Sequence, residues 1–288
     1  MEIERAEELG LCFGVSRAIK LLREAAGKYG EIETLGPVAH NRQLVQRLAK
    51  TGIKPVNELG QIQGRTLAIT THGVSPVVLS EIEAQHIHII DTTCPIVRKA
   101  QNAAKSLAEA HFDVIIFGEA EHAEVKGLLG WTKDKGVAAL DVKQIVTSSL
   151  LATRRRSNLY HLGIISQTTQ NKSSFVEFTT QLMAALPSKV EELRIINTLC
   201  QTTQRRQEAA VKLARKSQLM IVVGGHGSAN TKRLVEACLP IVETHLVEGA
   251  AEVDSSWFIG KHRVGITAGA STPGEAIEKV IAKLKFLM

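Results

Sequence analysis

The chain has 288 residues, 44% of them hydrophobic, which is enough for two or three domains with ordinary buried cores. Its four cysteines are too few for a disulfide framework, and its charged N-terminus does not resemble a secretory signal, so we expect an intracellular, cytoplasmic protein. No apolar run approaches the roughly 20 residues of a membrane helix, so no membrane partner is expected. The net charge of +6 is compatible with nucleic acid or with a small anionic substrate.

Strand-like and helix-like segments alternate along the chain and fall into three similar units. In each unit a cysteine opens a helical pattern, and an apolar strand follows it, at 30–37, 112–119 and 219–226. A short second strand comes next, and then a third strand that ends in polar residues and enters another helix. This alternation favours an α/β fold with mainly parallel sheets that carry helices on both faces.

A fourth strand closes the first two units, at 87–91 and 193–197, whereas the third unit ends in a helix. The N-terminal strand at 2–6 is still unassigned, so we expect it to pair in or near the sheet of the third unit. The predicted domains are therefore 1–93, 94–199 and 200–288. Because long flexible linkers are absent from the sequence, we expect the three units to pack tightly around a central cavity with pseudo-threefold symmetry.

Three cysteines occupy equivalent positions in these units, namely Cys12, Cys94 and Cys200. Each opens a helical pattern and has a basic residue five positions on. Each is also followed 28 positions later by a polar residue at a strand end, and these residues are His40, His122 and Ser228. A helix start and a nearby cation both stabilise a thiolate. Three converging thiolates suit an iron–sulfur cluster with one open iron, or a zinc ion completed by histidine. Cys238 lies outside the repeat and is expected to be a core thiol.

Three histidines also lie at strand ends, where a side chain can project into a cleft, and these are His40, His72 and His122. Imidazoles there could bind a phosphate group or complete a zinc site. Glu124 starts the helix after His122. A sheltered carboxyl group at this place could donate a proton, but a carboxylate at a helix start is equally explained by the helix dipole.

The third unit carries the glycine-rich stretch VVGGHGSANTKRL, which could cradle a phosphate group with its backbone amides, Ser228 and Asn230. It is not a Walker motif, because no GK[ST] follows. Ser271 lies at another strand end, and Gln167 and Thr168 lie at a third. Residues of these types are often only helix caps, and their positions in the repeat make a binding role equally plausible.

The motifs CFGVSRAI, GPVAHN, THGVSP, DTTCP, HAEVKG, SQTT, TLCQTTQRRQ and GITAGASTP extend in this order over nearly the whole chain. Together they resemble the 4-hydroxy-3-methylbut-2-enyl diphosphate reductase family, which performs the last step of the methylerythritol phosphate route to isoprenoids. The resemblance implies three α/β units around an iron–sulfur cluster. It also implies an oxidoreductase that removes the C4 hydroxyl group of (E)-4-hydroxy-3-methylbut-2-enyl diphosphate, giving isopentenyl and dimethylallyl diphosphate. The electrons would come from a ferredoxin or flavodoxin system.

The same resemblance implies roles for particular residues. Cys12, Cys94 and Cys200 would hold one [4Fe–4S] cluster with an open iron, and Glu124 would be the proton donor. The residues that match the substrate-binding positions of the family are His40, His72, His122, Gln167, Thr168, Ser228, Asn230 and Ser271.

Three positions depart from the family pattern. Ala229 stands where a serine is usual, which removes one diphosphate contact and costs about 1 kcal/mol of binding unless amides or water compensate. Glu121 and Ala123 flank His122 where Gly and Pro are usual, and Asn197 replaces a frequent Asp.

Two other functions are open on the residues alone. Cys and His ligands would also serve a zinc hydrolase. The basic charge and the arginine run at 154–156 would suit a zinc- or cluster-binding nucleic-acid-binding protein. With two Trp, two Tyr and seven Phe, however, a base-stacking surface is not expected, so we expect no nucleic-acid partner.

Overall fold

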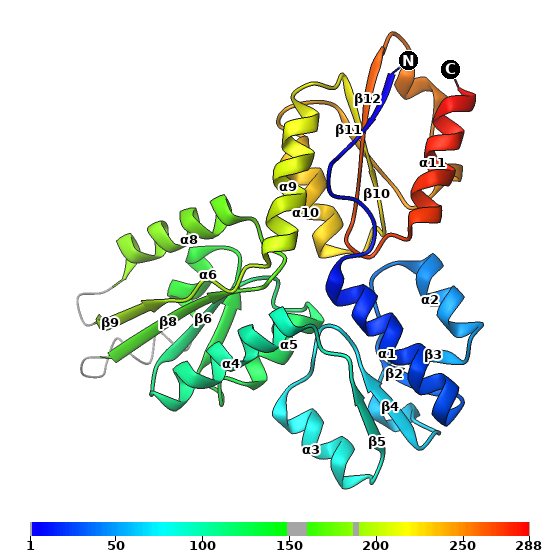
Figure 1. The fold of residues 1–288 in the computed structure, drawn as a ribbon. Coiled ribbons are helices and arrows are strands. Elements are labelled where there is room, and N and C mark those ends of the chain that lie inside the picture. Colours follow the sequence, from blue (N-terminus) through cyan, green and yellow to red (C-terminus); the bar gives the residue numbers. More distant parts are fainter. Residues whose placement is uncertain (1, 149–159, 187–189, 288) are drawn as a thin grey trace. The chain divides into compact units, whose positions relative to one another are not determined.

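The computed structural model describes residues 2–148, 160–186 and 190–287 (Figure 1). By its contacts the chain divides into two compact units. The terminal unit comprises residues 1–62 and 201–288, and the central unit comprises residues 63–200. The three predicted domains stay a prediction. Within the described residues the strands form three four-stranded sheets, ordered β1-β12-β10-β11, β3-β2-β4-β5 and β7-β6-β8-β9.

The first sheet of the terminal unit joins the two ends of the chain. Its strands are β1 (Glu2–Arg5), β12 (Arg263–Ala268), β10 (Leu219–Val223) and β11 (Thr244–Val247). All their pairings are parallel, and Glu2 lies opposite Arg263 in the register of β1 and β12. Figure 1 shows the dark blue N-terminal strand beside β12. This is the pairing with the third unit that the sequence leads us to expect for the N-terminal strand.

Helices cover both faces of this sheet, namely α9 (Gln201–Ala214), α10 (Ala229–Cys238) and α11 (Gly274–Phe286). Leu219, Ile221 and Val223 of β10 pack in one core with α11, while Met220 and Val222 pack in another with α9 and α10. Because both of its faces are buried, β10 is apolar along its whole length, as parallel strands usually are. Two short 3-10 helices, η2 (Ala250–Glu252) and η3 (Ser255–Phe258), follow β11.

The terminal unit also contains α1 (Phe13–Tyr29), β2 (Ile32–Leu35), α2 (Arg42–Ala49), β3 (Ile53–Val56) and the 3-10 helix η1 (Leu59–Gln61). Strands β2 and β3 pair in parallel. Helix α1 buries a stripe at helical spacing, formed by Val15, Ala18, Ile19, Leu22 and Ala25. Packing therefore fixes which face of α1 is buried, and Cys12 immediately precedes the helix.

The central unit has the same alternation of strands and helices. It begins with β4 (Thr66–Ile69), α3 (Pro76–Ala84) and β5 (His88–Asp91), and β4 and β5 pair in parallel. Its complete sheet has β6 (Asp113–Phe117) and β8 (Tyr160–Ser166) in the middle, with β7 (Gly136–Ala139) and β9 (Val190–Ile195) at the edges. The described helices of this unit that pack on this sheet are α4 (Pro95–Glu109), α5 (Ala123–Gly130), α6 (Val142–Thr147) and α8 (Lys172–Ala185).

Alternate residues of β6 enter two cores. Ile115 and Phe117 pack with α6 and α8, whereas Val114 and Ile116 pack with α4 and α5. The prediction of an α/β fold with three similar units and mainly parallel sheets is therefore confirmed. Among the described helices, none is both long enough and apolar enough to cross a membrane. The arginine run at 154–156 lies outside the described residues.

Candidate active site

The three repeated cysteines have the same local setting. Cys12 and Cys94 occupy the N-cap positions of α1 and α4, and Cys200 directly precedes α9. The Cys12 thiol accepts a capping hydrogen bond from the Val15 N–H at 3.5 Å. The backbone N–H of each cysteine donates to the carbonyl group of the second residue beyond a strand. The acceptors are Ala270 after β12 at 2.9 Å, Thr71 after β4 at 3.0 Å and Thr168 after β8 at 2.9 Å. The repeat seen in the sequence is thus reproduced in the backbone hydrogen bonds.

These cysteines are suited to bind a metal. None of the three forms a disulfide, and all three are partly exposed. Each lies beside a helix N-terminus, where the unpaired backbone N–H groups favour a thiolate. Cys238 differs, because it is fully buried in α10 and burial raises the pKa of its thiol to about 11. The structure therefore separates three accessible thiols from one core thiol, as the sequence led us to expect for Cys238.

In the terminal unit, the His40 loop lies against the glycine-rich loop that follows β10. The approach is so close that a Cβ atom on Gly225 would lie 2.2 Å from the His40 carbonyl oxygen. Burial, and then the positive charge of Lys232, lower the pKa of His40 from its ordinary value. The imidazole is therefore neutral at pH 7, and it can donate one hydrogen bond and accept another.

Three further candidates of the terminal unit lie in two loops that the backbone holds together. Ser228 caps α10, where its hydroxyl oxygen accepts a hydrogen bond from the backbone N–H of Thr231 at 3.3 Å. Asn230 follows in the first turn of α10, and Ser271 lies in the loop after β12. The Thr272 hydroxyl group and the Gly269 N–H both donate to the Val223 carbonyl, which joins this loop to the end of β10. Polar groups from two neighbouring strand ends thus meet at one edge of the sheet, as expected for a ligand site of a parallel sheet.

In the central unit, Glu124 is 2% exposed and lies in the first turn of α5. The Thr168 N–H donates to its Oε1 at 2.6 Å, and the Thr168 hydroxyl group donates to its Oε2 at 2.9 Å. Burial raises the pKa of Glu124 to about 7, although both hydrogen bonds oppose this shift. A carboxyl group with such a pKa can both hold and release a proton near neutral pH.

His72 and His122 lie beside each other, with ring centroids 5.6 Å apart in an edge-to-face arrangement. The His122 Nδ1 accepts a hydrogen bond from the Glu124 N–H at 3.2 Å, so a neutral His122 ring carries its proton on Nε2. Gln167 is fully buried, and its Oε1 accepts hydrogen bonds from the Glu119 N–H and the Gln170 amide group. The central unit thus brings together the predicted residues His72, His122, Glu124, Gln167 and Thr168, with Cys200 bonded to Thr168.

The departures from the family pattern have plain structural settings. Ala229 is the first residue of α10 and is 3% exposed. Glu121 is exposed and forms an ion pair with Lys126 at 2.8 Å. Asn197 accepts a hydrogen bond from the Leu199 N–H at 3.0 Å, a bond that an aspartate would also accept.

Sequence reasoning missed one residue that contacts the turn after His72. Gln101 of α4 is 1% exposed, and its amide group donates to the Val74 carbonyl at 3.3 Å. A Cβ atom on Gly73 would lie 2.3 Å from the Gln101 Nε2, and Gly73 has a φ of +68°. The turn after His72 therefore requires glycine. The sequence did contain a sign of this contact, because Gln101 is a polar residue on the otherwise apolar stripe of α4.

The fold and the repeated cysteines define a three-sheet α/β protein with three equivalent thiol sites. Comparison with known proteins narrows this class. The family model described as LytB protein matches residues 3–285. Curated relatives named 4-hydroxy-3-methylbut-2-enyl diphosphate reductase include one from Dehalococcoides mccartyi, 42% identical over 99% of this chain and 98% of its own length. Another, from Geobacter metallireducens, is 39% identical over 99% of this chain and 97% of its own length.

Solved structures agree with this result. A structure of (E)-4-hydroxy-3-methyl-but-2-enyl diphosphate reductase, described as the terminal enzyme of the non-mevalonate pathway, is 34% identical with a TM-score of 0.69, over 99% of this chain and all of its own. The structure of the Plasmodium falciparum E-1-hydroxy-2-methyl-but-2-enyl-4-diphosphate reductase is 25% identical with a TM-score of 0.89. The match covers 99% of this chain and 88% of the other. The chain belongs to the LytB family, and the resemblance noted in its sequence is confirmed.

Proposed function

We propose that this chain reduces (E)-4-hydroxy-3-methylbut-2-enyl diphosphate with two electrons and two protons, releasing water and giving isopentenyl and dimethylallyl diphosphate. One observation carries the proposal beyond the family likeness. The Thr168 N–H and hydroxyl group donate to the buried Glu124 carboxyl group, while the Thr168 carbonyl accepts from the Cys200 N–H. Thr168 therefore holds both the carboxyl group that would donate the proton and a cysteine that would bind the cluster.

Cys12, Cys94 and Cys200 would hold a [4Fe–4S] cluster. Their thiols form no disulfide and fit such a group, because each lies at a helix N-terminus that favours the thiolate. The buried Cys238 thiol does not, so three ligands are available rather than four. When bound, the cluster supplies electrons and one iron without a protein ligand, which can act as a Lewis acid toward the substrate hydroxyl group.

The diphosphate group would bind to Ser228, Asn230 and Ser271 at the edge of the sheet in the terminal unit. Asn230 supports this role, because its Oδ1 and Nδ2 are both buried and have no hydrogen-bond partner among the described residues. A buried amide group without partners is costly, and phosphate oxygens would accept from its Nδ2. His40, His72 and His122 would supply further donors to the substrate.

Glu124 would deliver the proton that lets the C4 hydroxyl group leave as water. Its pKa of about 7 makes a large part of the carboxyl groups protonated at neutral pH. The Thr168 hydroxyl group holds one carboxyl oxygen in place, and Gln167 lies next to it in the chain. Both would lie near the substrate hydroxyl group. The electron pair and the second proton would go to the C5 fragment left after loss of water, and protonation at one or the other end of its allyl system would give isopentenyl or dimethylallyl diphosphate. A ferredoxin- or flavodoxin-type protein would be the electron donor.

The test is an anaerobic turnover assay with this allylic hydroxy-diphosphate and an artificial reductant. We expect consumption of two electrons for each product molecule. Reductant oxidation without isopentenyl or dimethylallyl diphosphate, or no turnover by protein that carries about four irons per chain, would contradict the proposal. One zinc per chain and no colour would instead favour the zinc hydrolase or the nucleic-acid-binding protein.

A further inference from the structure

The inner face of α9 changes from polar to apolar along its length. Its buried stripe begins with Thr203, Arg206 and Gln207 and continues with Ala210, Leu213 and Ala214. The apolar end packs with Met220 and Val222 of β10. An arginine on such a stripe is unusual, because a buried guanidinium group costs free energy unless anionic or hydrogen-bonding groups offset its charge.

Arg206 is 3% exposed and lies at the ligand-binding edge of the sheet. Its Nη1 donates to the Ala268 carbonyl at 3.5 Å, and Ala268 is the last residue of β12. The loop with Ser271 begins directly after it. Helix α9 leads into β10 and lies beside α10 in Figure 1, so its polar first turns lie toward the carboxyl ends of the parallel strands.

Three polar residues near this edge have buried side-chain atoms without partners among the described residues. They are Asn230, with both amide atoms, and the hydroxyl groups of Thr231 and Thr267. Thr231 and Thr267 are fully buried. The Thr231 Oγ1 lies so close to two strand ends that a Cβ atom on Gly224 or Gly269 would lie 2.7 or 2.2 Å from it. This edge thus combines a buried cation with unused polar groups, which is typical of a site built for an anion.

We propose that Arg206 is the fixed positive charge of the diphosphate site. It is a positioning residue, which holds the end of β12 through the Ala268 carbonyl and adds a buried positive charge close to the loop that carries Ser271. This inference rests on the proposed function. An arginine keeps its charge at every accessible pH, and its attraction for an anion is only weakly screened where water is excluded.

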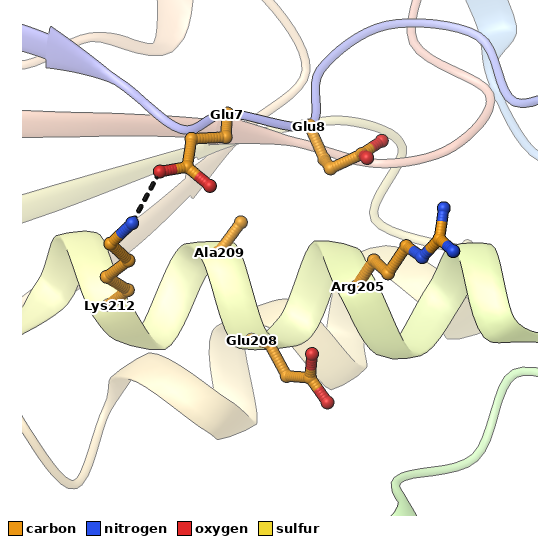
Figure 2. Close-up of a pocket in the computed structure, with 6 residues that line it drawn as sticks. All are labelled: Glu7, Glu8, Arg205, Glu208, Ala209 and Lys212. Carbon is orange, nitrogen blue, oxygen red and sulfur yellow. Dashed lines mark hydrogen bonds and ion pairs between the residues drawn. The ribbon is translucent and has the colours of Figure 1, made fainter.

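The neighbouring Arg205 provides a matched control. It is exposed and lines a surface pocket of about 320 Å³, together with Glu7, Glu8, Glu208, Ala209 and Lys212. Figure 2 shows Arg205 extending from α9 toward the segment that carries Glu8. Lys212 forms an ion pair with Glu7 at 2.5 Å. Carboxylates and solvent surround the Arg205 charge there, so its removal should not affect a diphosphate group bound at the strand ends.

The experiment measures binding of inorganic pyrophosphate to the anaerobic holoenzyme by calorimetry, together with KM and kcat. We expect Arg206→Met to weaken pyrophosphate binding about tenfold or more and to raise KM, with kcat within about threefold of the wild type. Arg206→Lys, which keeps the charge, should bind within about threefold of the wild type, and Arg205→Met should bind normally.

Two results would overturn the inference. One is a folded Arg206→Met protein that binds pyrophosphate within twofold of the wild type. The other is an Arg206→Lys protein that binds no better than Arg206→Met, because the charge would then not be the cause. A purely structural role would lower the melting temperature of both variants without changing pyrophosphate affinity. Since pyrophosphate binding requires no turnover, failure of the proposed reaction would leave this test intact.

Discussion

The raised pKa of Glu124 predicts how the rate depends on pH. Burial favours the protonated carboxyl group and raises its pKa from 4.5 to about 7. If this proton is the one delivered to the leaving hydroxyl group, kcat follows the protonated fraction. That fraction is about nine-tenths one pH unit below the pKa and about one-tenth one unit above it. We therefore expect kcat to fall about tenfold between pH 6 and pH 8.

The assay is kcat at saturating substrate with excess artificial reductant, measured from pH 6 to pH 9 under anaerobic conditions. Glu124→Gln should keep its cluster colour and lose turnover by about a hundredfold or more, which is the typical contribution of a general acid. Glu121→Gln is the control, because Glu121 lies in the same loop but is exposed and paired with Lys126. The dependence of kcat on pH in Glu121→Gln also shows any effect of pH on the reductant.

Two outcomes would refute this reasoning. One is a near wild-type rate in Glu124→Gln, which would show that another group donates the proton. The other is a wild-type profile that stays flat between pH 6 and pH 8. That result would mean either that the proton transfer does not limit kcat or that the carboxyl group is not held in its buried environment.

Three further predictions concern stability and the loops of the site. The folded state raises the pKa of Glu124, so its stabilising contribution is complete below pH 4.5 and is lost as pH rises through about 7. The free energy of unfolding of the wild type should therefore fall by about 3 kcal/mol over this pH range because of Glu124. The melting temperature of Glu124→Gln should rise relative to that of the wild type between pH 5 and pH 8, and a constant difference would contradict this. Gly225→Ala should displace the His40 loop and raise KM, whereas Gly227→Ala, with nothing within 4 Å of the new Cβ, should not; equal KM values would contradict the close approach. Ala229→Ser should restore a donor and lower KM about fivefold, and an unchanged KM would mean that backbone amides or water already compensate.

Much of the architecture is predictable because the sequence repeats. The strand expected at 112–119 is β6 (Asp113–Phe117), and the one expected at 219–226 is β10 (Leu219–Val223). The repeat also left one strand unassigned, which led to the pairing of the N-terminus with β12. These predictions rest on the apolar runs and on the number of strands in each repeat. Strands of a parallel sheet that is buried on both faces are apolar along their length and are therefore easy to recognise.

The chemistry of single side chains is less predictable. The sequence left Glu124 equally open to a catalytic and a merely local role, and only its burial distinguishes it from an ordinary helix-start carboxylate. Arg205 stood out in the sequence because it follows Cys200 by five positions. The adjacent Arg206 is the buried one, and its helical spacing from Ala210 and Leu213 was a sign of this that the sequence analysis did not use.

The central claim is that Cys12, Cys94 and Cys200 bind one cluster, and iron analysis of anaerobically purified single variants tests it most directly. The wild type and Cys238→Ser should each carry about four irons per chain with a broad visible absorption band. Cys12→Ser, Cys94→Ser and Cys200→Ser should each lose that band and most of the iron. Unchanged iron content and an unchanged spectrum in any one of these three variants would remove that cysteine from the ligand set and contradict the account.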